Sequence, residues 1–485
     1  MELDALIRAL APSDVIGRRA VEILDLAYDT RTVHDGALFF CVPGATRDGH
    51  DLATEAVGAG AVALVVERPL DVAVPQLLVE STRASMAVAA DAFFGMPTER
   101  LTVAGVTGTS GKTSTTYLLR AILEADGRST GMVGTVEWVV GGAARAAPHT
   151  TPEAIDLQRL FREMLDAGDV AAAIEASSHG SHYRRLDRVR FDALCFTNLG
   201  RDHLDLHGDI EEYFQAKRRL FTGLTPPPAA VNVGDPYGRR LADELAGAHR
   251  APLVTFGLRP EAEVRADGLE LGPRGSSFTA AGIPIETPLL GIFNVENVLA
   301  AVAAATLLDV DEEAIAEGVL AVKGVPGRFE AVDEGQDFAV VVDYSHKPDA
   351  LAAALQASRQ LGEGRLTVVF GAGGDRDRTK RAEMGRIARD LADRVIVTND
   401  NPRSEEPLAI VEEILQGAGI DVEVDLDRRS AIESAIAGAG AGDVVLIAGK
   451  GHEQGQEIAG VIQPFDDCDV ARGALARRRE AEAGP

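Results

Sequence analysis

The sequence is poor in cysteine and has no long apolar run. Its three cysteines, Cys41, Cys195 and Cys468, lie far apart without C-x-x-C spacing, which argues against a zinc site or a disulfide framework and favours a reducing compartment. The longest apolar stretch, Val298 to Leu308, is well short of the roughly 18 residues of a membrane span. The N-terminus, MELDALIRALAPSD, lacks the positive charge of a signal peptide. We therefore expect a cytoplasmic protein without membrane insertion.

Positive charge is also scarce. The chain carries 48 Lys and Arg against 75 Asp and Glu, a formal net charge of −27. Such a surface repels nucleic acids and anionic membranes, so we expect small-molecule substrates and no nucleic-acid partner. An anionic ligand has to be bound by local basic clusters and by backbone N–H groups.

Apolar runs typical of β-strands alternate with segments of helical period. The runs include AVALVVE, LTVAGVTG, VAAAIEASS, FAVVVDY, LTVVFGAGG, DRVIVTND and DVVLIAGKG. This order predicts an α/β fold with parallel strands, in which ligands bind at the carboxyl ends of the strands. Breaks rich in Pro, Gly or polar residues near 96–100 and 323–330 predict three domains, 1–98, 99–328 and 329–485.

The segment TGTSGKT has the character of a phosphate-binding loop. Its spacing differs from G-x-x-x-x-G-K-[ST], because Val106 stands where the first glycine is expected. Leu101 to Val106 reads as a buried strand and Thr113 to Ala125 as a helix. Between a strand and a helix, backbone N–H groups, a lysine and the helix N-terminus can bind phosphate, and a threonine can bind magnesium. The predicted ATP-binding residues here are Gly108, Thr109, Ser110, Gly111, Lys112 and Thr113.

Two further segments of the central region are rich in polar groups. AAAIEASSHG places Glu175 and Ser177 at the end of a strand, and TNLGRDHLDLHGD contains His203 and His207. The histidines are four residues apart, which is compatible with a zinc hydrolase, although no third ligand has matching spacing. With Glu175 and Thr113, the same segment can instead form a magnesium site of hard oxygen ligands and one imidazole.

The C-terminal third repeats this pattern. Polar residues follow the strands in DYSH, GAGGDRDRTKR, VTNDNPRSEEP and LIAGKGHE. Arg376 and Arg403 belong to two of these segments, and a guanidinium can bind a carboxylate through two parallel hydrogen bonds. Taken singly, each arginine is as typical of an ordinary surface loop as of a carboxylate-binding site.

Together the motifs DTR at 29–31, TGTSGKT, DNPR and GKGHE resemble the Mur ligases, ATP-dependent amide-forming enzymes of peptidoglycan precursor assembly. The resemblance covers nearly the whole chain and is closest to the MurE type, which adds the third amino acid to UDP-N-acetylmuramoyl-L-alanyl-D-glutamate. It implies an N-terminal UDP-substrate domain, a central P-loop ATPase domain and a C-terminal Rossmann-like domain that binds the amino acid. The implied reaction forms an acyl phosphate and ADP, and an amine then attacks.

The resemblance also implies roles for individual residues. Lys112, Glu175, His203 and Lys217 match catalytic positions, and ATP is accompanied by two Mg²⁺ ions. The implied metal ligands are Thr113, Glu175, His203 and a carbamylated Lys217. By itself Lys217, in YFQAKRRLF, reads as a solvated helix charge. Implied nucleotide contacts outside the loop are Asn294, Asn297, Arg328 and Asp343. Implied UDP-substrate contacts are Thr30, Thr150, Thr151, Ser177 and Arg185, and the loop ATRDG at 45–49 matches the uracil-binding loop.

The implied amino-acid site contains Arg376, Asp400, Asn401, Pro402, Arg403, Gly449 and Glu453. Arg403 resembles the arginine of the enzymes specific for meso-diaminopimelate, whose distal carboxylate suits a guanidinium. We therefore predict a monomer that uses UDP-N-acetylmuramoyl-L-Ala-D-Glu and meso-diaminopimelate. The alternatives are the same ligation with L-lysine, another ligase of the superfamily, and, in a different class, a small-molecule kinase or NTPase.

Overall fold

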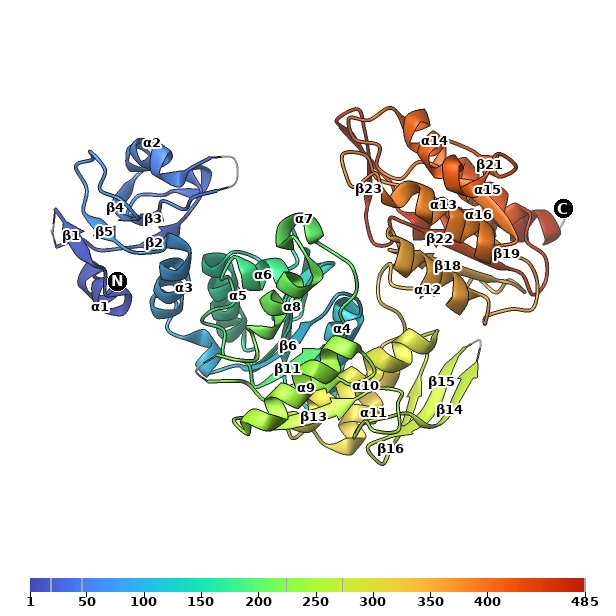
Figure 1. The fold of residues 1–485 in the computed structure, drawn as a ribbon, viewed down its shortest axis with the longest axis horizontal. Helices are drawn as coiled ribbons and strands as arrows, with labels where there is room; N and C mark the ends of the chain where they lie inside the picture. The colour runs from blue at the N-terminus through green and yellow to red at the C-terminus, as the bar shows by residue number, and fades with distance from the viewer. Residues whose placement is uncertain (18–19, 45–46, 224, 273, 484–485) are drawn as a thin grey trace. The chain divides into compact units, whose positions relative to one another are not determined.

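The computed structural model describes residues 1–17, 20–44, 47–223, 225–272 and 274–483 (Figure 1). Residues 45 and 46 of the predicted uracil-binding loop lie outside these ranges. The chain divides into two compact units. The first unit comprises Met1–Arg265 and Asn297–Gly318, and the second comprises Ala266–Glu296 and Val319–Pro485. None of the helices in the described ranges is long and apolar enough to cross a membrane.

The N-terminal part of the first unit is a sheet covered on both faces. Its strands run in the order β1-β5-β4-β3-β2. Leu38 and Phe40 of β3 pack with the helices α1 and α3, whereas Ala37 and Phe39 pack with α2, as the period of a strand requires. The elements are α1 (Leu3–Leu10), β1 (Asp14–Ile16), β2 (Asp25–Ala27), η1 (Thr30–Thr32), β3 (Ala37–Phe40), η2 (Gly49–Leu52), α2 (Ala53–Gly58), β4 (Ala61–Val66), β5 (Gln76–Leu78), α3 (Thr82–Phe93) and η3 (Pro97–Glu99).

The central sheet of the first unit runs in the order β13-β12-β11-β6-β10-β7-β8-β9. The strands from β13 to β7 are parallel, and β8 and β9 are antiparallel additions. The strands are β6 (Thr102–Thr107), β7 (Thr130–Val133), β8 (Glu137–Val140), β9 (Ala143–Ala146), β10 (Ala171–Glu175), β11 (Ala193–Phe196), β12 (Ala229–Asn232) and β13 (Leu253–Phe256). The helices are α4 (Lys112–Ala125), α5 (Ala154–Ala167), α6 (Ser178–His182), α7 (Leu204–His207), α8 (Ile210–Arg218) and α9 (Pro236–Ala248). The carboxyl ends of β6, β10 and β11 are therefore neighbours.

The second unit contains a sheet in the order β17-β18-β22-β19-β20-β21, parallel except for β17. Alternate residues face different layers: Val341 and Leu446 pack with α12, α13 and α14, whereas Val340 and Val445 pack with α15 and α16. The strands are β17 (Glu330–Ala331), β18 (Ala339–Asp343), β19 (Leu366–Phe370), β20 (Arg394–Val397), β21 (Glu423–Val424) and β22 (Val444–Ala448). The helices are α12 (Pro348–Ser358), α13 (Lys380–Leu391), α14 (Pro407–Ala418), α15 (Arg428–Ala437) and α16 (Asp467–Ala483).

Smaller elements complete the fold. The strands β14 (Asp267–Gly272), β15 (Gly275–Ala280) and β16 (Ile283–Thr287) form an antiparallel sheet, and β23 (Gly455–Ile458) pairs with β24 (Val461–Pro464). The remaining helices are α10 (Ile292–Leu307) and α11 (Glu312–Ala321). The prediction of an α/β fold with parallel sheets is confirmed. The boundaries at residues 98 and 328 stay predictions.

Candidate functional site

The predicted phosphate-binding loop connects β6 to α4, as its spacing predicts. Gly108 has φ +146° and Gly111 has φ +84°, conformations that L-residues with a Cβ rarely adopt. A Cβ on Gly108 would also lie 1.9 Å from Thr197 Oγ1, and one on Gly111 would lie 2.3 Å from Asn297 Oδ1. Glycine is therefore required at both positions, and Asn297 lies against the loop.

Two lysine side chains contact the backbone of this loop. Lys112 Nζ donates to the carbonyl oxygens of Gly108 and Thr109, at 3.0 and 2.9 Å. Lys217 Nζ, from α8, donates to Gly108 O at 2.8 Å and lies 4.6 Å from the centre of the Tyr213 ring. Lys217 is only 1% exposed. The reading of Lys217 as a solvated helix charge, which the local pattern favours, is therefore wrong, because α8 packs its buried face against the loop.

Glu175 ends β10, next to Val106 of β6 in the sheet register. It is 1% exposed, and its carboxylate accepts hydrogen bonds from Thr135 N (2.8 Å) and Thr135 Oγ1 (3.0 Å). The Thr135 and Thr150 hydroxyls are 3.1 Å apart. Glu175 is thus a buried carboxylate held in a fixed orientation at the end of its strand.

The predicted substrate residues Thr151, Ser177 and Arg185 adjoin Glu175. Thr151 Oγ1 donates to the Glu175 carbonyl at 2.7 Å and accepts from Ser177 N at 3.1 Å. Arg185 donates through Nη1 to Thr151 O and through Nη2 to Glu153, at 2.8 and 2.7 Å. The structure therefore brings Thr150, Thr151, Glu175, Ser177 and Arg185 together in one cluster.

Thr30 lies in η1, where Asp29 accepts a hydrogen bond from Arg31 N. Tyr28, two residues earlier, donates to Asp156 of α5 at 2.5 Å. Burial and this carboxylate raise the pKa of the Tyr28 phenol, so the tyrosine keeps its proton and remains a donor. This bond fixes the segment before Thr30 to the helix that follows Thr150 and Thr151.

His203 precedes α7 with φ +52°. Its Nε2 is 3.3 Å from Asp202 Oδ2, and its ring centre is 4.6 Å from that of His179. Burial lowers the pKa of His179, so this ring favours its neutral form. The predicted role of His203 as a metal ligand stays a prediction.

The residues around the loop suit magnesium better than a metal held by protein groups alone. Within the described ranges, no group of three or more His, Cys, Asp or Glu side chains is arranged to bind a metal ion. Mg²⁺ in nucleotide sites is bound by one or two protein oxygens, several waters and the phosphates. Glu175 and the buried hydroxyl of Thr113 supply that kind of donor set.

In the second unit, the polar segments predicted from the sequence follow adjacent parallel strands. Asp343 ends β18, GAGG follows β19, TNDNPR follows β20 and GKGHE follows β22. Carboxyl ends of adjacent parallel strands lie at one edge of a sheet. The structure therefore brings these four segments together although they span more than a hundred residues of sequence.

Asn401 is the centre of a polar network at this edge. Its Nδ2 donates to Glu453 at 2.7 Å, while its Oδ1 accepts from Lys450 Nζ and from Glu457 N, both at 3.0 Å. Lys450 Nζ is also 3.2 Å from Glu453 Oε2. The packing at Gly449 is tight, because a Cβ there would lie 2.5 Å from Asp400 Oδ2. The network orients Glu453. The sequence prediction missed Lys450 and Glu457 as members of this network, because their local sequence does not show that they contact Asn401.

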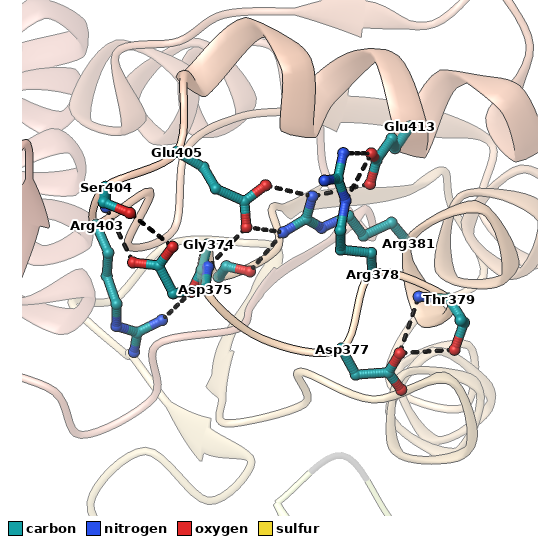
Figure 2. Close-up of polar contacts among 11 residues, drawn as sticks. Gly374, Asp375, Asp377, Arg378, Thr379, Arg381, Arg403, Ser404, Glu405 and Glu413 are labelled. Atoms are coloured by element: carbon teal, nitrogen blue, oxygen red, sulfur yellow. Dashed lines mark hydrogen bonds and ion pairs between the residues drawn. The ribbon is translucent and has the colours of Figure 1, made fainter.

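Figure 2 shows the two arginine-bearing loops side by side. Arg403 is half-buried, and its Nη1 donates to Gly374 O at 2.7 Å. A Cβ on Gly374 would lie 1.9 Å from Pro402 O, so the loops touch through their backbones. Arg376, in contrast, is exposed.

The remaining predicted nucleotide contacts, Asn294, Arg328 and Asp343, belong to the second unit. Asn294 Nδ2 donates to Leu290 O at 2.9 Å. Asp343 accepts from Phe329 N at 2.8 Å, and burial raises the pKa of its carboxyl group. The Arg328 guanidinium lies 4.7 Å from the centre of the Tyr344 ring.

His452, in the GKGHE segment, gives this unit a testable pH dependence. Burial, reinforced by Arg328, lowers the pKa of His452 to about 4, whereas an unfolded histidine titrates at about 6.5. Between these values the unfolded chain holds more protons, so stability falls as the pH falls. We expect His452→Gln to reduce the stability lost by the second unit between pH 7 and pH 5 by about 2 kcal/mol.

Urea unfolding of the second unit at both pH values measures this difference. His34→Gln, at an exposed histidine of the first unit, is the control and should leave the loss unchanged. An equal loss in wild type and His452→Gln would contradict the prediction.

Comparison with known proteins gives three family matches in chain order. Residues 22–99 match the model "Mur ligase family, catalytic domain", residues 106–305 match "Mur ligase middle domain", and residues 327–451 match "Mur ligase, glutamate ligase domain". The ligase named UDP-N-acetylmuramoyl-L-alanyl-D-glutamate–2,6-diaminopimelate ligase in Streptomyces coelicolor is 46% identical over 477 residues, covering 94% of this chain and 93% of the relative. The chain belongs to the Mur ligase family.

Similarity to other Mur ligases supports this assignment. The ligase of the same name in Bacillus licheniformis is 45% identical over 471 residues, covering 95% of this chain and 96% of the relative. A solved structure of a ligase with that name is 32% identical with a TM-score of 0.69, covering 94% of this chain and 95% of the other. The predictions of a Mur ligase of the MurE type and of the three-domain Mur architecture are therefore confirmed.

Proposed function

We propose that this Mur ligase joins meso-diaminopimelate to UDP-N-acetylmuramoyl-L-alanyl-D-glutamate, forming an amide and converting ATP to ADP and phosphate. The observation that carries the proposal is the full-length similarity to ligases named for this reaction. The phosphate-binding loop of the first unit and the arginine-bearing loops of the second unit contain the groups that this reaction needs. We further propose that the enzyme acts in the cytoplasm, as a monomer, on these small-molecule substrates without a nucleic-acid partner.

The first unit would carry out phosphoryl transfer. A carboxylate oxygen of the muramoyl dipeptide attacks the γ-phosphorus of ATP, and ADP leaves. This reaction depends on positioning and charge neutralisation more than on covalent help from the protein. The N–H groups of Gly111, Lys112 and Thr113 at the N-terminus of α4 and the ammonium of Lys112 would bind the phosphates, with Asn297 beside the loop. Thr109 N and Ser110 N donate to Asn198 and keep the loop in shape. The amine of the amino acid then attacks the acyl carbon, phosphate leaves, and the amine loses its proton.

Magnesium, when bound, would neutralise phosphate charge and align the reacting oxygens. Thr113 and Glu175 would hold it, because Thr113 offers a buried hydroxyl in the first turn of α4 and Glu175 offers a buried carboxylate at the end of β10. Thr135 supports this assignment by binding both oxygens of the Glu175 carboxylate. His203 is a further proposed ligand from the segment that follows β11.

We propose that Lys217 is carbamylated in the active enzyme. Its ammonium would first lose one proton, and the neutral amine would then react with CO₂ and release a second proton. The product is a carbamate, an anionic oxygen donor suited to magnesium. The buried position beside Gly108 O supports this proposal. We expect wild-type enzyme in carbon-13-labelled bicarbonate to show a carbamate resonance that Lys217→Met lacks. A resonance that persists in Lys217→Met would contradict the assignment.

Thr30, Thr150, Thr151, Ser177 and Arg185 are the proposed contacts of the UDP-muramoyl dipeptide. Thr151, Ser177 and Arg185 belong to the same hydrogen-bonded cluster as Glu175. A dipeptide bound there would lie next to the carboxylate proposed to hold magnesium. The bond from Tyr28 to Asp156 would keep the segment containing Thr30 attached to this part of the unit.

The second unit would bind the incoming amino acid. Arg403 would pair with the distal carboxylate of meso-diaminopimelate and Glu453 with its distal ammonium, while Arg376 would bind the other carboxylate. Asn401 and Lys450 hold Glu453 in place. The neighbouring Asp400, Pro402 and Gly449 complete the proposed site, and Asn294, Arg328 and Asp343 are proposed nucleotide contacts.

The deciding experiment measures ADP and phosphate release with UDP-N-acetylmuramoyl-L-Ala-D-Glu, ATP and magnesium. Meso-diaminopimelate, L-lysine and no amino acid are tested in parallel, and the product is identified by mass. Release that requires meso-diaminopimelate, with a tripeptide product, is the expected result. Release with L-lysine alone would keep the ligase and overturn the specificity, and ATP turnover without the muramoyl substrate would indicate an NTPase.

Arg403→Lys should reduce discrimination between meso-diaminopimelate and L-lysine. Lysine keeps the charge and loses the planar fork that binds a carboxylate through two bonds. We expect kcat/KM for meso-diaminopimelate to fall about 100-fold, with little change in the KM for ATP. Arg359→Lys, at an exposed arginine of the same unit paired with Asp393, is the control. Equal efficiency of wild type with both amino acids would contradict the role of Arg403.

A further inference from the structure

The two arginine-bearing loops of the second unit share an unusual backbone feature. Asp375, directly before Arg376, has φ +54°, and Arg403 itself has φ +54°. Residues other than glycine adopt this left-handed conformation at a cost, and they keep it where surrounding contacts enforce it. Contacts with other parts of the chain are therefore expected to hold both loops in this conformation.

Arg381, at the start of α13, supplies such contacts. Its side chain is completely buried. Nη1 donates to Glu405 at 3.0 Å and to Glu413 at 2.8 Å, while Nη2 donates to Glu405 at 2.8 Å and to Gly373 O at 3.2 Å. In Figure 2 this guanidinium lies between the Glu405 and Glu413 carboxylates. Arg381 thus connects the loop after β19, the loop after β20 and α14.

Glu405 connects the same two loops from the other side. Besides Arg381, its carboxylate accepts from Asp375 N at 2.6 Å. The hydrogen bonds from Arg381 lower the pKa of Glu405 to about 2, so the group is ionised throughout the neutral range. Asp375 in turn accepts from Ser404 N at 3.1 Å and from Ser404 Oγ at 2.7 Å. The residue before Arg376 is therefore bonded to the two residues that follow Arg403.

We propose that Arg381 and Glu405 form a clamp that fixes the spacing between Arg376 and Arg403, and that this spacing sets the selectivity for an amino acid with two carboxylates. Both are positioning residues, because they act through the loops and not on the substrate. The inference rests on the proposed function, in which Arg376 and Arg403 each bind one carboxylate. The binding of a ligand held at two points depends on the distance between these points. Displacements of about 1 Å reduce rates by about 100-fold in well-aligned sites.

The selective variant is Glu405→Gln, which keeps the shape of the side chain and removes its charge. The matched control is Glu413→Gln, because Glu413 accepts from the same Arg381 guanidinium and from Arg378 but is located on α14, outside both loops. If Arg381 needed only a counter-ion, the two variants would behave alike. A clamp requires that they differ.

The kinetic test measures KM for meso-diaminopimelate, ATP and the muramoyl dipeptide, and kcat at saturation, with full-length protein. We expect Glu405→Gln to raise the KM for meso-diaminopimelate about tenfold or more. The other KM values, and all constants of Glu413→Gln, should stay within about twofold of wild type. Three results would overturn the proposal. They are an unchanged KM for meso-diaminopimelate in Glu405→Gln, an equal rise of this KM in both variants, and a fall in kcat together with a rise in all three KM values.

Hydrogen exchange separates failure of the clamp from failure of the proposed function. In Glu405→Gln the amides of 371–376 and 403–406 should exchange faster, while Glu413→Gln should match wild type there. Unchanged exchange in Glu405→Gln would overturn the clamp even if the ligase reaction is confirmed. If wild type does not use meso-diaminopimelate at all, the proposed function and the selectivity role fall together, and the exchange data still decide whether Arg381 and Glu405 hold the loops.

Discussion

Lys112→Met should reduce kcat/KM for ATP in the ligase reaction by about 1,000-fold or more. The lysine begins α4, and its ammonium lies over the phosphate-binding loop through bonds to Gly108 O and Thr109 O. In the proposed reaction the phosphates would take over these bonds, and the charge would stabilise the γ-phosphoryl group during transfer. Methionine has similar length and no charge, so it removes the electrostatic contribution with little change in packing.

The measurement is ADP release at varied ATP with saturating muramoyl dipeptide and meso-diaminopimelate. Lys323→Met is the matched control, because Lys323 is exposed and its ammonium donates to the nearby Leu320 O. Equal thermal unfolding of both variants and wild type would show that the fold is retained. A loss below about tenfold in Lys112→Met would contradict the role of this lysine in phosphate binding.

Arg428→Met should produce the largest loss of stability in the second unit, about 3–5 kcal/mol. Arg428 and Asp467 form an ion pair whose two side chains are both completely buried. Nε and Nη2 of Arg428 each lie 2.7 Å from an Asp467 oxygen. Removal of the guanidinium leaves the Asp467 carboxylate buried without its partner, and desolvation makes such a charge costly.

The same guanidinium also supports the proposed amino-acid site. It donates to Asn399 O at 3.3 Å and to Ala448 O at 3.0 Å. These carbonyls directly precede Asp400 and Gly449, so Arg428 joins the ends of β20 and β22. We therefore expect faster amide exchange in both loops of Arg428→Met, together with the lower free energy of unfolding.

Urea unfolding of the second unit, monitored through the hydrogen exchange of α15 and α16, measures the loss in the free energy of unfolding. The double variant Arg428→Met/Asp467→Leu should recover much of it, because no unpaired charge remains. Arg477→Met is the matched control: Arg477 joins the same two helices through an exposed pair with Glu433, 2.6 Å long, and should cost at most about 1 kcal/mol. Similar losses in Arg428→Met and Arg477→Met would contradict the prediction.

The phosphate-binding loop could be predicted because its determinants are local. A strand, a loop with two glycines, a lysine and a helix follow one another within about two dozen residues, and each has its own sequence pattern. The alternation of strands and helices likewise predicts parallel sheets, since parallel strands need a crossover connection. The positions of Asp343, Asn401, Arg403 and Glu453 at strand ends follow from the same reasoning.

Other parts of the site could not be read from local pattern. Lys217 has the sequence context of a surface charge, yet it is buried because α8 packs against the loop after β6. Thr135 binds Glu175 from 40 positions away, and neither residue has a pattern that identifies the other. Family resemblance selected Lys217 and Glu175, and it gave no indication of Thr135.

The sequence by itself determined the class of fold, the phosphate-binding loop and the order of the polar segments, because periodicity and short motifs are properties of neighbouring residues. Only the tertiary structure decided which charges are buried and which are bonded to one another. Arg381, Glu405, Arg428 and Asp467 look like ordinary surface residues in the sequence. Arg381, Arg428 and Asp467 become buried and Glu405 becomes half-buried. Parallel strands bring distant segments to one edge of a sheet, where a charge removed from water has to find its partner.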